Sequence, residues 1–154
     1  QKAESNLQKM GYENMQFVKG DIEDMQFGEN MMDVILSNCV LNLVPDKQKA
    51  FKEMHRVLKT SGHFCVSDVV LQGELPESLQ QDAEMYAGCV SGALPKEDYL
   101  KAIETAGFKE VVIHKQKEII IPDEILLKYM SEQALAVFKQ SEKGIYSITV
   151  SAKK

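Results

Sequence analysis

Long apolar runs are absent from this sequence, and none approaches the roughly 20 residues that a membrane-spanning helix requires. The first residues also lack the basic-then-apolar pattern of a secretory signal. We therefore expect no membrane partner. Because the chain begins with Gln1 rather than Met, we expect it to be processed or to be the downstream part of a longer protein.

Cysteine is scarce. The chain has three cysteines, an odd number, and no Cys-x-x-Cys pair. This pattern argues against a disulfide framework and predicts a reducing, cytoplasmic location. Since no histidine stands near a cysteine at ligand spacing, the sequence also argues against a zinc site.

An excess of positive charge is also missing. The formal net charge is −5, and the basic residues are scattered along the chain. Binding to a phosphate backbone needs a basic face, so we expect no nucleic-acid partner. With 44% hydrophobic and 27% charged residues, the 154-residue chain has the composition of one globular domain spanning residues 1–154.

Two apolar stretches, residues 33–40 and 63–71, have the continuous hydrophobicity of strands that are covered on both faces. Apolar residues between them recur at spacings of three and four, which predicts a helix with Gly62 just beyond its end. These residues are Ala50, Phe51, Met54, Val57 and Leu58. A strand, a helix and a strand in this order form a right-handed crossover that joins two parallel strands.

The remaining segments extend this α/β pattern. Strands are expected at 15–18, 110–121 and 145–150, and a loop with a short helix near 77–86 at 72–94. A helix begins at Pro95, with Tyr99 among its inward residues. The other expected helices span 2–10 and, in two short pieces, 123–140.

Two cysteines occupy positions that suggest chemistry. Cys39 falls at the carboxyl end of a predicted buried strand, and Cys89 lies in a loop between Gly88 and Gly92. Two such thiols could bind the same soft ligand. A buried structural thiol is the alternative for Cys39, because cysteine is often fully buried. Cys65 stands in the middle of a strand and is assigned to the core.

Polar residues also follow two predicted strands. Asp21 comes directly after the 15–18 strand, and ligands of open parallel sheets lie at the carboxyl ends of strands. An acidic residue there can accept a hydrogen bond from an adenine amino group, although a solvated acidic turn is the alternative. Asn38 can orient a small polar ligand through its amide.

Several blocks of sequence together resemble the class I S-adenosylmethionine-dependent methyltransferases. They are Gly20-Asp21-Ile22-Glu23, the stretch from Asp33 to Leu43, Pro45-Asp46-Lys47, Arg56-Val57-Leu58-Lys59 and Ser67-Asp68-Val69. Three blocks resemble, more specifically, the arsenite methyltransferases. These are Ser37-Asn38-Cys39-Val40, Gly73-Glu74-Leu75-Pro76 and the stretch from Ala87 to Ala93.

This resemblance implies a Rossmann-like α/β fold, mostly parallel with an antiparallel C-terminal strand. It implies S-adenosylmethionine as the cofactor, with Asp21, Ile22 and Glu23 at its adenine end and Asn38 near its methionine end. Cys39 and Cys89 would be the catalytic thiolates that bind the substrate, trivalent arsenic supplied as arsenite or its thiol conjugates. Soft thiolate ligands select soft, thiophilic ions of this kind.

The sequence departs from the family in three ways. No Gly-x-Gly turn is present, the first two strands of the family's sheet are missing, and a third arsenic-binding thiol is missing. We therefore expect the C-terminal portion of a methyltransferase fold, inactive in isolation. The strand at 33–40 would then expose a hydrophobic edge. Either the 15–18 strand moves to cover it, or the chain self-associates there, or the missing segment is supplied elsewhere.

Two other functions stay open at this point. The chain could methylate another small acceptor while its cysteines are structural. It could also be a non-catalytic module that binds arsenic through its thiols. Arsenite should stabilise the protein only where a thiolate site exists, and cofactor binding separates an enzyme from a simple thiol module.

Overall fold

A four-stranded sheet in the order β1-β2-β4-β3 forms the framework of the computed structural model. Residues 2–73, 90, 92–141 and 143–154 are described. The strands are β1 (Met32–Asn38), β2 (Leu58–Gln72), β3 (Lys109–Glu118) and β4 (Gly144–Lys153). β1 pairs with β2 in parallel, whereas β4 is antiparallel to both β2 and β3. Three strands thus run one way and the C-terminal strand runs the other, which confirms the expected fold class.

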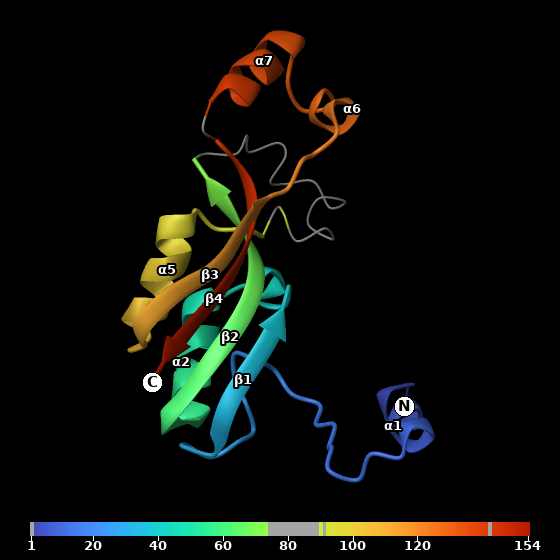
Figure 1. Ribbon diagram of the computed structural model, residues 1–154, viewed down its shortest axis with the longest axis vertical. Helices are drawn as coiled ribbons and strands as arrows, with labels where there is room; N and C mark the ends of the chain where they lie inside the picture. The colour runs from blue at the N-terminus through green and yellow to red at the C-terminus, as the bar shows by residue number, and fades with distance from the viewer. Residues whose placement is uncertain (1, 74–89, 91, 142) are drawn as a thin grey trace.

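Helices cover one face of this sheet and extend beyond one end. α2 (Lys47–Val57) and α5 (Lys96–Thr105) lie side by side against the sheet (Figure 1). α6 (Asp123–Leu126) and α7 (Glu132–Gln140) lie beyond the start of β4, and α1 (Lys2–Met10) stands apart from the sheet. The β1-α2-β2 unit is the predicted crossover between parallel strands.

The main core lies between the sheet and these two helices. Phe51 of α2 meets Tyr99 of α5 edge-on, with ring centroids 5.5 Å apart, and contacts Phe64 of β2 at 6.0 Å. All three side chains are fully buried. The apolar spacing read from the sequence therefore identified the buried face of α2 correctly. Asp46 begins this helix by accepting the Lys49 N–H at 2.9 Å.

Residues 15–18 do not form the expected strand. A strand needs a hydrogen-bonded neighbour, and none of the strands in the described residues pairs with this segment. Its apolar residues stay about half exposed, with Phe17 at 48% and Val18 at 51%. The backbone that leads to Asp21 is therefore irregular rather than a strand.

Gly62 does not cap α2, because the helix ends at Val57 and β2 begins at Leu58. Gly62 instead lies within β2, where an added Cβ would come within 3.0 Å of the Lys59 and Asp33 carbonyl oxygens. The glycine is needed because the two strands approach closely at this point.

Cys65 is only partly buried, which corrects its assignment to the core. Successive residues of a strand point to opposite faces, and its neighbours Phe64 and Val66 take the helix-covered face. Cys65 therefore points to the other, less covered face. A continuous apolar run concealed this alternation.

β1 forms one edge of the sheet, and its hydrophobic residues are exposed as expected: Val34 at 45% and Leu36 at 76%. Such an edge is a template for pairing with another strand. Self-association through β1 stays a prediction.

Truncating a side chain should destabilise the protein much more in the buried core than on the exposed edge strand β1. Phe64→Ala should lower the free energy of unfolding by about 3–5 kcal/mol, because it leaves a cavity beneath Phe51. Leu36→Ala on the exposed edge should change it by less than about 0.5 kcal/mol. Urea denaturation of both variants measures the difference, and equal losses would contradict this description of the core.

Candidate functional site

The carboxyl end of β1 lies beside Ser67 of β2, ahead of the end of β2 at Gln72, and forms the centre of the candidate site. Asn38, the last residue of β1, is exposed and pairs in register with Ser67 of β2. Cys39 follows, and its N–H donates to the Ser67 carbonyl at 2.8 Å. The parallel pairing therefore brings the two predicted residues Asn38 and Cys39 to the edge where α/β sheets bind ligands.

Cys39 adopts a left-handed backbone conformation with φ of 55°. This conformation costs a residue with a side chain about 1–3 kcal/mol and persists only when the surroundings impose it. The chain turns sharply here from β1 into the short 3₁₀ helix η1 (Leu41–Leu43). The Cys39 side chain is half-buried, so its sulfur is neither core filling nor fully exposed.

A buried polar cluster, made of Asn42, Lys47, Asp68 and Tyr99, lies beneath this turn. The Tyr99 hydroxyl donates to Asp68 Oδ2 at 2.7 Å, and Asn42 Nδ2 donates to the Val69 carbonyl at 2.8 Å. Asn42 and Asp68 are each only 1% exposed. Lys47 donates to the carbonyls of Asn42 and Val44 at 3.5 and 3.3 Å.

Burial dominates the electrostatics of this cluster. It raises the pKa of Asp68 from 3.8 to about 6, against the opposing effects of the Tyr99 hydrogen bond, the Lys47 charge and the Asn42 N–H. Burial also lowers the pKa of Lys47. The pKa of Tyr99 is raised, mainly by burial and also by the charges of Asp68 and Cys39.

Sequence reasoning gave these cluster residues no site role. Tyr99 was expected only as an inward residue of its helix. Asp68 did carry a usable signal, because it is an acidic residue inside an apolar strand of valines. A charge at such a position requires a buried partner.

Asp21 and Glu23 lie in a tight turn ahead of α2. Asp21 is exposed, and its Oδ1 accepts the Glu23 N–H at 2.9 Å. Glu23 Oε1 accepts the Asp46 N–H at 2.8 Å, so Glu23 ties the turn to the start of α2. Arg56 holds the following residues through the Met25 and Phe27 carbonyls, at 3.0 and 2.8 Å. The turn is therefore fixed to α2 at both ends.

A hollow of about 200 Å³ opens beside this turn. Ile22 and Asp21 line it together with apolar side chains that include Val18, Met25 and Phe27. Apolar walls suit the flat faces of an adenine ring, and the Asp21 carboxylate suits its amino group. These residues fit the adenine end of S-adenosylmethionine, whereas the sequence holds no Gly-x-Gly turn for its methionine end.

Cys89 lies outside the described residues, but the segment after it is anchored to β2. The Leu71 N–H donates to the Leu94 carbonyl at 2.9 Å, and Leu71 forms a bridge with Pro95. Val90 and Ala93 are buried in a second apolar cluster with Ile145 and Leu135. β2 thus contacts the Cys39 turn at Ser67 and the chain that follows Cys89 further along, at Leu71.

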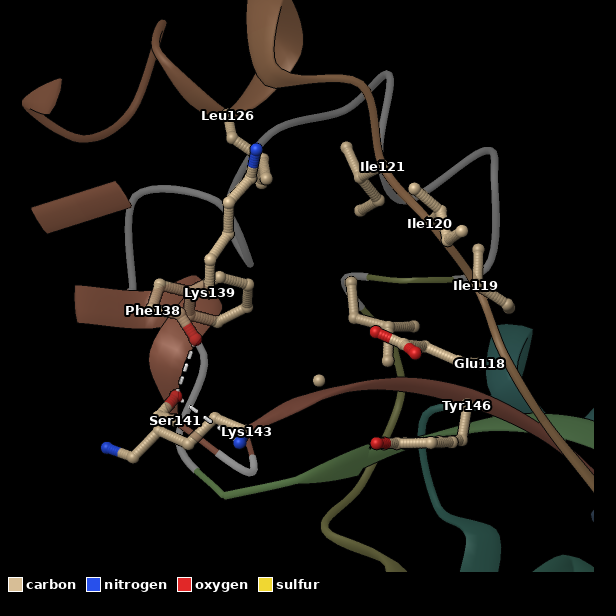
Figure 2. Close-up of a pocket in the computed structure, with 12 residues that line it drawn as sticks. Glu118, Ile119, Ile120, Ile121, Leu126, Phe138, Lys139, Ser141, Lys143 and Tyr146 are labelled. Atoms are coloured by element: carbon tan, nitrogen blue, oxygen red, sulfur yellow. Dashed lines mark hydrogen bonds between the residues drawn. The ribbon is translucent and has the colours of Figure 1, made fainter. Parts of the chain in front are cut away.

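A larger pocket of about 420 Å³ lies between the β3–α6 connection and the start of β4 (Figure 2). Its walls combine apolar side chains, with Ile119, Ile121 and Phe138 among them, and charged ones such as Lys139 and Glu118. Among the described lining residues, none was singled out from the sequence. Lys139 is paired with Asp123 at 2.6 Å, so the cation is already neutralised.

The described part of the chain contains no group of three or more His, Cys, Asp or Glu side chains that could hold a metal ion. None of its helices is long and apolar enough to cross a membrane.

The buried Asp68 should make folding stability depend on pH. Its native pKa lies above its unfolded value, so its contribution is fully present below about pH 4 and is lost as pH rises through 6. Asp68→Asn keeps an acceptor for Tyr99 and stays neutral. Its unfolding free energy should rise relative to the unsubstituted protein by up to about 3 kcal/mol between pH 4 and 7. Denaturant titrations across this range test this, and a constant or falling difference would contradict it.

Comparison with known proteins places this geometry in a family. The model of a methyltransferase domain family matches residues 1–107. The arsenite methyltransferase of Halobacterium salinarum is 37% identical over 117 residues, which cover 76% of this chain and 30% of that protein. The corresponding enzyme of Aquipseudomonas alcaligenes is 34% identical over 130 residues, which cover 82% of this chain and 38% of that protein. The chain therefore spans about a third of the length of these relatives.

Among solved structures, the chain is similar to an arsenic(III) S-adenosylmethionine methyltransferase from Chlamydomonas reinhardtii. The TM-score is 0.77 at 31% identity, and the match covers 96% of this chain and 48% of that one. S-adenosylmethionine is the cofactor of these methyltransferases. The match over residues 1–107, the similarity to this solved structure and the strand order agree: the chain belongs to the methyltransferase domain family and has the class I S-adenosylmethionine-dependent methyltransferase fold.

Proposed function

We propose that this chain is the part of an arsenite methyltransferase that holds the adenine end of the cofactor and binds trivalent arsenic through Cys39 and Cys89. The observation that carries the proposal is the placement of Cys39: half-buried, in a constrained left-handed turn, at the carboxyl end of β1. Similarity to arsenite methyltransferases supports it.

The thiolates would serve as substrate ligands. Deprotonated sulfur is the metal-binding form of cysteine, and it is a soft ligand that suits a thiophilic ion. Bound by sulfur, arsenic(III) keeps its lone pair, so the site needs no general base. The protein's main contribution would be to fix this lone pair in line with the methyl donor, which lowers the entropic cost of reaction.

The cofactor would lie with its adenine end in the hollow beside Asp21. Asp21 would accept from the adenine amino group, and the backbone N–H of Ile22 would meet a ring nitrogen. Glu23 would support this turn through Asp46, and Asn38 at the end of β1 would lie nearer the methionine end. When bound, S-adenosylmethionine supplies an electrophilic methyl group. Because the Gly-x-Gly turn is absent, we expect the isolated chain to be inactive.

Removing either proposed thiolate should abolish arsenic methylation in the full-length protein. Cys39→Ser and Cys89→Ser should each lower the rate of methyl transfer from labelled cofactor to arsenite at least a hundredfold. Cys65→Ser is the matched control, because Cys65 is a partly buried cysteine within β2 and has no role in the proposed site. This variant should keep the rate within twofold. Full activity of both Cys39→Ser and Cys89→Ser would overturn the arsenic assignment.

The same variants also distinguish arsenic methylation from the two alternative functions, methylation of another small acceptor and arsenic binding without catalysis. Arsenite should raise the melting temperature of the unsubstituted protein and not that of Cys39→Ser. Methylation of a different acceptor without an arsenite shift would indicate another small-molecule methyltransferase. An arsenite shift without cofactor binding would indicate a thiol module.

The adenine assignment predicts a loss of cofactor affinity on removal of one carboxylate. Asp21→Ala should weaken the binding of S-adenosylhomocysteine about tenfold, equivalent to about 1.4 kcal/mol. Asp33→Ala removes an exposed carboxylate paired with Lys59 at the other end of β1, and should leave affinity unchanged. Calorimetric titration of full-length protein measures both, and equal affinities for the two variants would refute the assignment.

A further inference from the structure

Three consecutive residues of β2 accept hydrogen bonds at or near the left-handed turn at Cys39. Ser67 accepts the Cys39 N–H at 2.8 Å, Asp68 accepts the Tyr99 hydroxyl at 2.7 Å, and Val69 accepts the Asn42 amide at 2.8 Å. The Ser67 contact reaches the turn itself, and the Val69 contact reaches η1 directly after the turn. The Asp68 contact joins β2 to α5.

Asp68 is the point where these elements meet. Its carboxylate is buried, interacts with the Asn42 N–H and lies in the field of Lys47 on α2. The Tyr99 hydroxyl of α5 donates to the same carboxylate at 2.7 Å. A shift of Asp68 or Tyr99 would therefore alter the position of Asn42 and of the turn before it.

α5 also connects to the second thiol segment. It begins at Lys96, directly after Leu94 and Pro95, which are bonded to Leu71 at the end of β2. The Asp68–Tyr99 hydrogen bond thus fixes α5 against the strand that holds the Cys39 turn. A pair whose only purpose was to fill the core would not need a buried carboxylate at this place.

We propose that Asp68 and Tyr99 are positioning residues for Cys39, and that their hydrogen bond holds the turn in the conformation that presents the sulfur to its ligand. The proposal deepens the proposed function and rests on it for the identity of that ligand. Neither residue touches the reacting atoms in this scheme. Their effect is carried through Asn42 and the backbone of the turn.

The substitution Tyr99→Phe tests this proposal with little disturbance of packing. It removes one hydroxyl and keeps the ring that packs edge-on against Phe51. Tyr146→Phe is the matched control, because Tyr146 is a half-buried tyrosine of β4 that faces the larger pocket. Asp68→Asn serves as the conservative variant, since its amide oxygen still accepts from Tyr99.

The first readout is the alkylation of single cysteines by iodoacetamide in full-length protein, resolved by mass spectrometry. In Tyr99→Phe, the loosened turn should speed alkylation of Cys39 at least threefold, while Cys65 within β2 keeps its rate. Tyr146→Phe should change neither rate. A loss of fold would instead raise both rates, so the ratio of Cys39 to Cys65 separates positioning from general destabilisation.

The second readout is the dissociation constant for sodium arsenite. Tyr99→Phe should weaken binding five- to tenfold, although its Cys39 is more accessible, and Asp68→Asn should stay within twofold. An unchanged Cys39-to-Cys65 ratio in folded Tyr99→Phe would overturn the proposal. If the unsubstituted protein fails to bind arsenite, the proposed function fails, and the alkylation ratio still decides the positioning role.

Discussion

The parallel pairing of β1 with β2 is the constraint on which the rest of the site depends. It sets Asn38 opposite Ser67 and delivers the Cys39 N–H to the Ser67 carbonyl. Without that register, the left-handed turn would have no backbone anchor and the buried Asp68 would have no reason to lie beneath it. The crossover helix α2 enforces the parallel direction, and its buried face supplies much of the core that fixes the register.

The site is built in two halves on this framework. The turn at Asp21 is tied to α2 through Glu23 and Arg56, and the Cys39 turn is tied to β2. Both halves therefore rest on the β1-α2-β2 unit, while the segment after Cys89 joins β2 closer to its end, through Leu71. A rigid sheet edge that carries irregular loops is a common way to place reactive groups without loss of stability.

Much of this arrangement could be read from the sequence because local patterns determine it. The spacing of Phe51 and Met54 fixed the buried face of α2, and the apolar run at 33–40 predicted the strand that β1 forms, with Cys39 near its carboxyl end. The strand at 15–18 was wrong because strand formation depends on a neighbour that local sequence does not reveal. The predictions for Cys65 and Gly62 failed because β2 is longer than its apolar run. The run did not show that alternate side chains of β2 point to opposite faces, nor that the strand already begins at Leu58. The Asp68–Tyr99 contact joins residues 31 positions apart, so no local pattern could predict it.

X-ray absorption at the arsenic edge tests the central claim most directly, because it counts the sulfur atoms bound to arsenic in the full-length protein. Sulfur-only coordination that loses one sulfur in Cys39→Ser, and retains all of them in Cys65→Ser, is the predicted result. Oxygen coordination, or an unchanged sulfur count in Cys39→Ser, would contradict the placement of the substrate at the end of β1.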